Sequence, residues 1–297
     1  MTIKLIDIIY RLKIPKVILR FIMMNFLDIA SINNLLLTVK EMNVLDNYSK
    51  DLIINANKGF QWNCQHGHLT VAKWLYSVDS IDSQADDGYA FRHSCKNGHL
   101  TVAKWLYSIG ANIHADNEYA FRLACQNGHL ITAQWLYSIG NVNIHVVNEY
   151  AFRLACKNGH LITAQWLYSI GEVNIHTINE YAIGMSCANS HLTVAKWLYS
   201  IGSNVHADDE YAFRVSCKNG HLTVAKWLYS LGADIHADNE SAFRVSCNSG
   251  HLTVAKWLYS LGNVDIYAND EYVFINTNGK ILDWIKSLTT KNKKTKN

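Results

Sequence analysis

One phrase, GHLTVAKWLYS or a close variant of it, occurs seven times along the 297 residues of this chain. The copies begin at Gly67, Gly98, Gly128, Gly159, Ser190, Gly220 and Gly250. Successive copies start 30 or 31 residues apart, so a unit of constant size is repeated, with one residue inserted at a single place in some copies. A period of this length indicates an array of stacked supersecondary units rather than a globular domain with one core.

Each unit predicts two short helices. In one copy, residues 118–126 place apolar side chains at helical spacing before Gly128 breaks the run. Residues 130–139 predict a second helix, which is apolar on two sides and ends at Gly140. Helices of about nine residues cannot bury such faces alone, so each unit must pack against its neighbours in a solenoid.

The unit resembles an ankyrin repeat. Residues 98–115, GHLTVAKWLYSIGANIHA, are similar to the second helix and following turn of that family, and Tyr-Ala-Phe-Arg at residues 119–122 replaces its Thr-Pro-Leu-His opening. The resemblance covers about residues 60–275 and implies an all-α solenoid of stacked helix-turn-helix units with short finger loops. Because the family's threonine cap is absent, we expect Asp116 or Asn117 to cap the first helix.

We expect four segments along the chain, because the ends of a solenoid must be covered. They are a helical N-terminal cap or F-box-like segment at 1–55, seven ankyrin-like repeats at 56–275, a C-terminal capping helix at 276–288 and a basic disordered tail at 289–297.

The first of these segments resembles an F-box over residues 13–43. The candidate contact residues are Ile14, Pro15, Ile18, Leu19, Ile22 and Leu27. The resemblance implies docking to a Skp-type adaptor of a cullin ubiquitin ligase, with the repeats selecting the protein to be modified. The alternative is that the segment only caps the solenoid, because apolar helices of this spacing are common.

The near-identity of neighbouring repeats and their Tyr-Ala-Phe-Arg and Trp-Leu-Tyr-Ser spellings resemble the ankyrin proteins that giant DNA viruses encode in large multigene sets. The resemblance implies a protein that acts inside an infected host cell, so we expect a cytoplasmic location, the host cytoplasm if the protein is viral. No targeting peptide is evident at residues 1–20, and polar residues interrupt the apolar stretch at 17–37, so we expect no membrane span.

The formal net charge of +3 is unevenly distributed. Residues 280–297 carry +5 and residues 1–50 carry +3, which leaves −5 on residues 51–279. A nucleic-acid-binding domain concentrates positive charge on its folded body. The sequence therefore predicts a protein partner and no nucleic acid.

Seven cysteines fall at one position per repeat: Cys64, Cys95, Cys125, Cys156, Cys187, Cys217 and Cys247. Equivalent Cα atoms of helices stacked about 8–10 Å apart exceed the disulfide limit of about 7 Å, so we interpret these cysteines as small buried residues in a reducing compartment. A histidine follows each cysteine by four residues, but the two lie on different helices without four converging ligands, so we expect no metal and no cofactor. Only Ile183-Gly184-Met185 breaks the pattern, which indicates a flexible joint or a decayed repeat.

Basic residues recur on one face of the first helix and are the candidate partner-binding residues: Arg92, Arg122, Arg153, Arg214, Arg244, Lys96, Lys157 and Lys218. In ankyrin proteins this helix and the fingers line the concave surface. The resemblance therefore implies a basic stripe beside acidic fingers that contain Asp116, Glu118, Glu149, Glu180, Asp208, Glu210, Asp238 and Glu240. Two interpretations stay open: the stripe binds an acidic partner segment, or each arginine pairs with the carboxylate of a neighbouring finger.

A residue that is present in equivalent copies serves the architecture before it serves a unique reaction centre, so we expect no catalytic residue and no enzyme. The tryptophan series from Trp74 to Trp257 favours packing between repeats over an exposed row. The sequence thus predicts a monomeric, non-catalytic scaffold that binds an unidentified protein on its concave repeat surface. The alternative is a substrate-recruiting adaptor of a cullin ubiquitin ligase.

Overall fold

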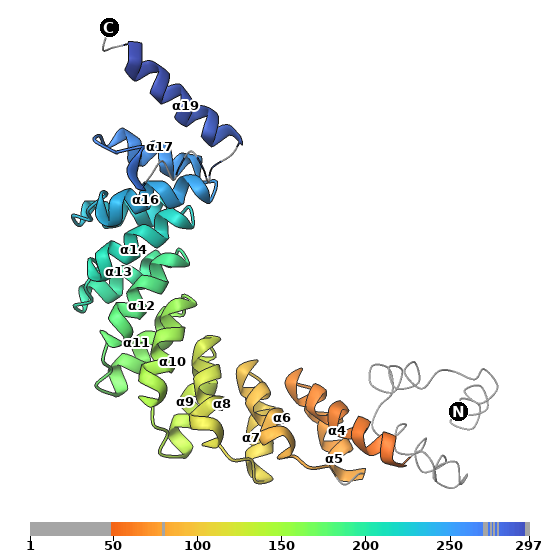
Figure 1. Ribbon diagram of the computed structural model, residues 1–297. Coiled ribbons are helices and arrows are strands. Elements are labelled where there is room, and N and C mark those ends of the chain that lie inside the picture. Colours follow the sequence, from red (N-terminus) through yellow and green to blue (C-terminus); the bar gives the residue numbers. More distant parts are fainter. Residues whose placement is uncertain are drawn as a thin grey trace, which may run out of the picture. The chain divides into compact units, whose positions relative to one another are not determined.

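The computed structural model describes residues 49–78, 81–269, 273, 275, 277 and 279–294, and this part of the chain is helical, without strands (Figure 1). Its helices are α4 (Ser49–Gln65), α5 (Leu69–Val78), α6 (Ala85–Lys96), α7 (Leu100–Ser108), α8 (Ala115–Gln126), α9 (Leu130–Ile139), α10 (Val146–Lys157), α11 (Leu161–Ile170), α12 (Thr177–Ala188), α13 (Leu192–Ser200), α14 (Ala207–Lys218), α15 (Leu222–Ser230), α16 (Ala237–Asn248), α17 (Leu252–Ser260) and α19 (Gly279–Lys294).

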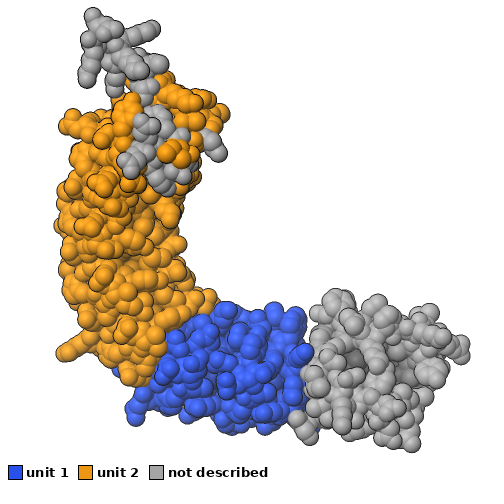
Figure 2. Space-filling view, viewed as in Figure 1, with its two compact units in different colours: residues 1–124, 131–142 blue, residues 125–130, 143–297 orange. Residues whose placement is uncertain are grey.

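The chain divides into two compact units, coloured separately in Figure 2. The first unit comprises residues 1–124 and 131–142, and the second comprises residues 125–130 and 143–297. Within the first unit α4 lies beside α6, and within the second unit α10, α12, α14 and α16 each lie beside the next. The first helices of consecutive repeats are therefore stacked within each unit, as the repeat pattern predicts.

Within the second unit, aromatic residues join successive repeats. Phe213 of α14 is fully buried, and its ring meets the Trp257 ring of α17 at a centroid distance of 6.3 Å. Tyr229 of α15 meets the same Trp257 ring edge-on at 5.9 Å. Tyr199 and Trp227 repeat this edge-on contact one repeat earlier, at 6.1 Å. The described tryptophans of this series thus pack between repeats, one of the two arrangements that the sequence allowed.

The turn between the two helices of a repeat favours glycine, which all copies have except the one with Ser190, where φ is +65°. Gly159 has φ +81°, a conformation that side chains with a Cβ rarely adopt. A Cβ atom at Gly159 would also lie 2.5 Å from Nδ1 of His191, the residue that precedes α13. The histidine of one repeat therefore covers the turn of the repeat before it.

The helix bounds can be compared with the segments that we expected from the sequence. The F-box-like residues Ile14, Pro15, Ile18, Leu19, Ile22 and Leu27 lie outside the described residues. Helix α19 continues to Lys294 and so includes residues 289–294 of the segment that we expected to form the tail. Helix α12 continues through Gly184, the position that we interpreted as a flexible joint or a decayed repeat. In the described part of the chain, no helix has the length and apolar character that a membrane crossing needs.

Candidate functional site

The loop that leads into each first helix has an unusual backbone. Asp116, Asn117 and Glu118 have φ values of 52°, 52° and 61°, and the equivalent residues at the start of α10, α12, α14 and α16 have the same left-handed conformation. These residues lie within the bounds given for the helices and form a loop at the start of each one. The prediction that Asp116 or Asn117 caps the helix was wrong, because a cap residue has extended backbone angles. Aspartate and asparagine are among the residues that best tolerate the left-handed region.

The arginines of the first helices hold these loops. In Arg122, Nε donates to the carbonyl of Asn117 and Nη2 donates to the carbonyl of Asp116, both at 2.7 Å. Arg153, Arg214 and Arg244 bond to the two equivalent carbonyls of their own loops, and Arg92 bonds to the carbonyl of Asp86. The guanidinium groups thus satisfy loop carbonyls that would otherwise depend on water.

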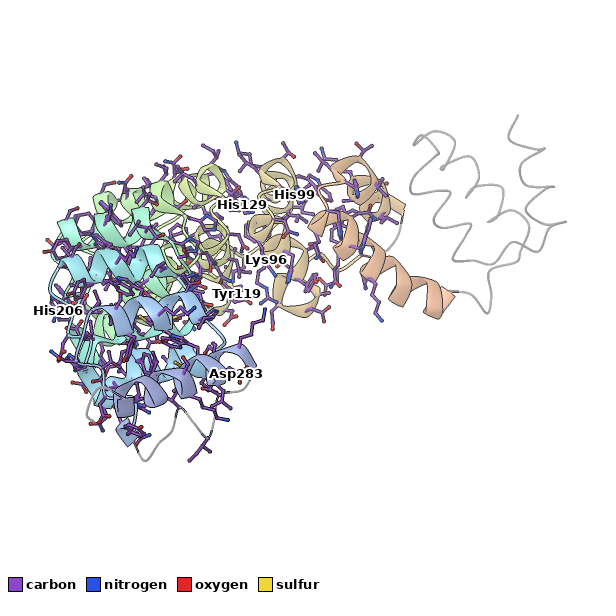
Figure 3. The ribbon with its side chains drawn as sticks, turned by 90° about the horizontal axis from the view of Figure 1, so that it is seen from above. Lys96, His99, Tyr119, His129, His206 and Asp283 are labelled. Atoms are coloured by element: carbon purple, nitrogen blue, oxygen red, sulfur yellow. The ribbon has the colours of Figure 1, made fainter. Side chains whose placement is uncertain are left out.

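Two arginines also reach the next loop. Arg92 pairs with the Asp116 carboxylate at 3.7 Å, and Arg214 pairs with the Asp238 carboxylate at 2.7 Å. The ring of Tyr119, labelled in Figure 3, lies under two guanidinium groups, with the Cζ atoms of Arg92 and Arg122 at 5.1 and 5.0 Å from its centroid. These contacts match the internal ladder that was one of the two interpretations of the arginines.

The lysines of the candidate set lie differently. Lys96, labelled in Figure 3, and Lys157 are half-buried at the ends of α6 and α10, and Lys218 is exposed at the end of α14. The structure therefore separates the eight basic candidates into arginines that brace loops and lysines at the surface.

The glutamates of the fingers are not at the surface. Glu118, Glu149, Glu180, Glu210 and Glu240 are buried, with 6–8% of each residue exposed. The glutamates of the expected acidic fingers therefore do not contribute an exposed acidic surface. Each Oε1 accepts a hydrogen bond from Nδ1 of the histidine four residues earlier, with a distance of 2.7 Å for His206 and Glu210, for example. A carboxylate can be buried when a donor compensates its lost hydration.

Two of these glutamates also hold the following loop in the second unit. Oε1 of Glu149 accepts from Nδ1 of His145 at 2.8 Å and from the backbone N–H of Asn174 at 3.4 Å. Oε1 of Glu240 accepts in the same way from the backbone N–H of Asp265 at 3.2 Å. One carboxylate therefore connects successive loops, which keeps them in register.

Replacing Glu149 by alanine should lower the free energy of unfolding by about 1–3 kcal/mol, because the N–H groups of His145 and Asn174 lose their acceptor. Glu149→Gln keeps an oxygen in place and should cost less. Urea unfolding followed by circular dichroism measures the difference. The control is Glu172→Ala at an exposed loop position, which should change stability by less than about 0.5 kcal/mol. An equal loss for Glu172→Ala and Glu149→Ala would contradict the connecting role.

A second series of histidines precedes the second helices. Nε2 of His221 lies 3.0 Å from the carbonyl oxygen of Ala188, the last residue of α12. Burial lowers the pKa of His160 and His191, and a neighbouring histidine, His129 and His221 respectively, lowers each further. The neutral ring is thus favoured where these histidines cross from one repeat to the next.

All seven cysteines are free thiols and are buried. In the part of the chain that the structure describes, histidine, cysteine and carboxylate groups nowhere gather in threes as a metal ion would need.

Comparison with known proteins decides the family. A model of ankyrin repeats, in three copies, matches residues 60–148 and 183–270. The chain belongs to the ankyrin repeat family. The predicted all-α ankyrin-repeat solenoid is therefore confirmed. Ankyrin repeats generally mediate protein–protein interaction, and their fold is in general a non-catalytic scaffold.

Solved structures agree with the ankyrin fold. The crystal structure of the human ASB11 ankyrin repeat domain is similar to this chain, with a TM-score of 0.54 and 19% sequence identity over 69% of this chain and 97% of that one. No curated protein matches the sequence.

Two ankyrin loops differ from the rest in a way that the sequence analysis missed. Val147 and Ile178 stand at the first left-handed position of their loops and are 47% and 51% exposed. The equivalent residues are Asp86, Asp116, Asp208 and Asp238. Aligning the seven copies on this position would have revealed the difference.

Proposed function

We propose that this chain is a non-catalytic scaffold that binds a protein partner through the loops and first helices of its ankyrin repeats. The observation that supports the proposal is the repeated bracing of these loops. In the loops at the start of α8, α10, α14 and α16, an arginine bonds to two loop carbonyls and a buried glutamate bonds to a histidine. Loops that are already ordered lose little conformational entropy on binding, so they favour affinity for a partner.

The arginines take part in this bracing, so we assign them to presenting the loops rather than to direct contact. Among the eight basic candidates, the surface lysines Lys96, Lys157 and Lys218 are left to contact a partner. Seven free thiols are compatible with a reducing compartment, and this supports a location in the cytoplasm, that of the host if the protein is viral. We also propose that the chain is a monomer.

Photo-crosslinking tests which surface binds. A photoreactive amino acid is placed at Lys218 on a first helix or at Lys196 on a second helix, since both lysines are exposed. After irradiation in a cell lysate, we expect a partner protein crosslinked specifically through position 218 and not through position 196. Crosslinking only through position 196 would place binding on the opposite helices and contradict the proposal.

A second candidate function is substrate recruitment to a cullin ubiquitin ligase through residues 13–43. It is supported by the proline and the apolar spacing of that segment, which resembles an F-box. Pull-down with the intact chain and with a chain lacking residues 1–50, followed by mass spectrometry, separates the two functions. Loss of a Skp-type adaptor and a cullin on deletion, while other partners persist, would support recruitment. Their absence from the intact sample would exclude it.

A further inference from the structure

The exposed residues of the loops in the second unit change from apolar to acidic along the row of repeats. Val147 and Ile178 expose β-branched apolar side chains on two successive loops, and the next loop exposes Asp208 and Asp209. An exposed apolar pair beside two carboxylates is a pattern that a single partner segment could recognise.

The backbone makes the apolar pair unusual. Val147 and Ile178 have φ values of 55° and 53°, a region that β-branched residues rarely occupy. Aspartate adopts this conformation more readily and stands at the same position at the start of α14 and α16. The loop conformation alone would therefore favour aspartate at positions 147 and 178. The exposed side chains of Val147 and Ile178 also contribute little to the core.

The carboxylates of Asp208 and Asp209 can bind a partner because α12, the first helix of the preceding repeat, has no arginine that could pair with them. Arg214 pairs with Asp238 of the loop that follows it, but the residue equivalent to Arg214 one repeat earlier is Gly184. The ring of Tyr211 lies against this glycine, 3.0 Å from the place of a Cβ atom. Within the described residues, no ion pair engages the carboxylate of Asp208 or Asp209.

We propose that Val147, Ile178, Asp208 and Asp209 bind an extended segment of a protein partner that carries two apolar side chains followed by a basic one. Stacked helices lie about 8–10 Å apart, and an extended segment in the polyproline II conformation advances about 3.1 Å per residue with three residues per turn, so that every third side chain faces the same side. The two apolar residues of the partner therefore lie about three residues apart, and its lysine or arginine lies about three residues beyond them. The segment can run in either chain direction.

The charge of this surface selects among partners. The acidic pair repels nucleic acid, and the arginines that lie at these loops, Arg153 on α10 and Arg214 on α14, are bonded to carbonyls of the loop residues. Arg214 also pairs with the Asp238 carboxylate. A basic peptide with apolar residues forms ion pairs with these carboxylates and apolar contacts with Val147 and Ile178. This inference rests on the proposed scaffold function, since it names the segment that the scaffold recognises.

Selection from a phage library of random peptides about twelve residues long, displayed against the intact chain, tests the proposal. We expect the enriched peptides to share the apolar, apolar, basic spacing. The double substitution V147D and I178D should weaken their binding at least about tenfold, because two apolar side chains lose their contacts. D208N with D209N should weaken binding and reduce its salt dependence.

The control is I131D with I162D, which makes the same change at two exposed isoleucines on α9 and α11 and should leave binding within about twofold. Folding of V147D and I178D is expected to be intact, because aspartate is native at equivalent positions, and a thermal melt checks it. Enriched peptides that bind V147D and I178D as tightly as the unmodified chain, or enrichment of no peptide, would overturn the inference. Crosslinking of a lysate protein through Lys218 in that same double variant would show that the scaffold function stands without this surface.

Discussion

Ellman's reagent at pH 8 should leave the cysteine thiols of the folded protein essentially unreacted for as long as the repeats stay closed. Burial raises the pKa of Cys64, Cys187 and Cys247 from 9.0 to about 12, and it raises the pKa of the other four thiols further. A thiol with a pKa near 12 holds about one-thousandth as much thiolate at pH 8 as one with its ordinary pKa. Since the thiolate is the nucleophile, the reaction should slow by at least that factor.

The control is the same reaction in guanidinium chloride, where all seven thiols should react at once. In buffer, any slow reaction should follow the opening of individual repeats, and its rate should rise with added denaturant. A thiol that reacts in buffer as fast as in denaturant would show that its repeat is open, which would contradict a closed stack.

Replacing Phe213 by alanine should lower the free energy of unfolding of the second unit by about 3–5 kcal/mol. Phe213 is fully buried, and its ring packs against Trp257 of the next repeat. The substitution therefore removes core volume and a contact between repeats together. Guanidinium unfolding followed by tryptophan fluorescence measures the loss.

The matched control is Ile162→Thr, which places at an exposed position of α11 the residue found at the equivalent positions 193 and 223. It should change stability by less than about 0.5 kcal/mol. A loss below about 1 kcal/mol for Phe213→Ala would mean that the stack closes around the cavity and that the contact between repeats contributes little.

The helices and their core were predictable because their signal is local. The apolar period of Phe213 and Leu228 appears within one repeat, and glycines such as Gly159 mark where a helix must stop. The arrangement of the loops was not predictable in the same way. Glu210 is a charged residue in a polar stretch, so it resembles a surface residue until a left-handed loop brings its carboxylate under His206.

The apolar residues of two loops were missed for the opposite reason. Val147 and Ile178 are residue types that usually lie in a core. Only the structure shows that they stand in left-handed loops with exposed side chains. Gly184 was likewise interpreted as a weak point in a helix. In the structure, Gly184 stands where Arg214 stands one repeat later. Arg214 pairs with Asp238, so Asp208 has no equivalent arginine partner.

The sequence by itself determined the repeating unit, its two helices, the buried face of each helix and the family. These follow from hydrophobic periodicity, which neighbouring residues of one repeat set among themselves. Only the tertiary structure decided which charged groups are used within the chain and which remain for a partner. That division depends on contacts between residues of neighbouring repeats, 24 positions apart for Arg214 and Asp238 and 25 for Glu149 and Asn174. It also depends on a loop conformation that no local pattern of apolar residues specifies.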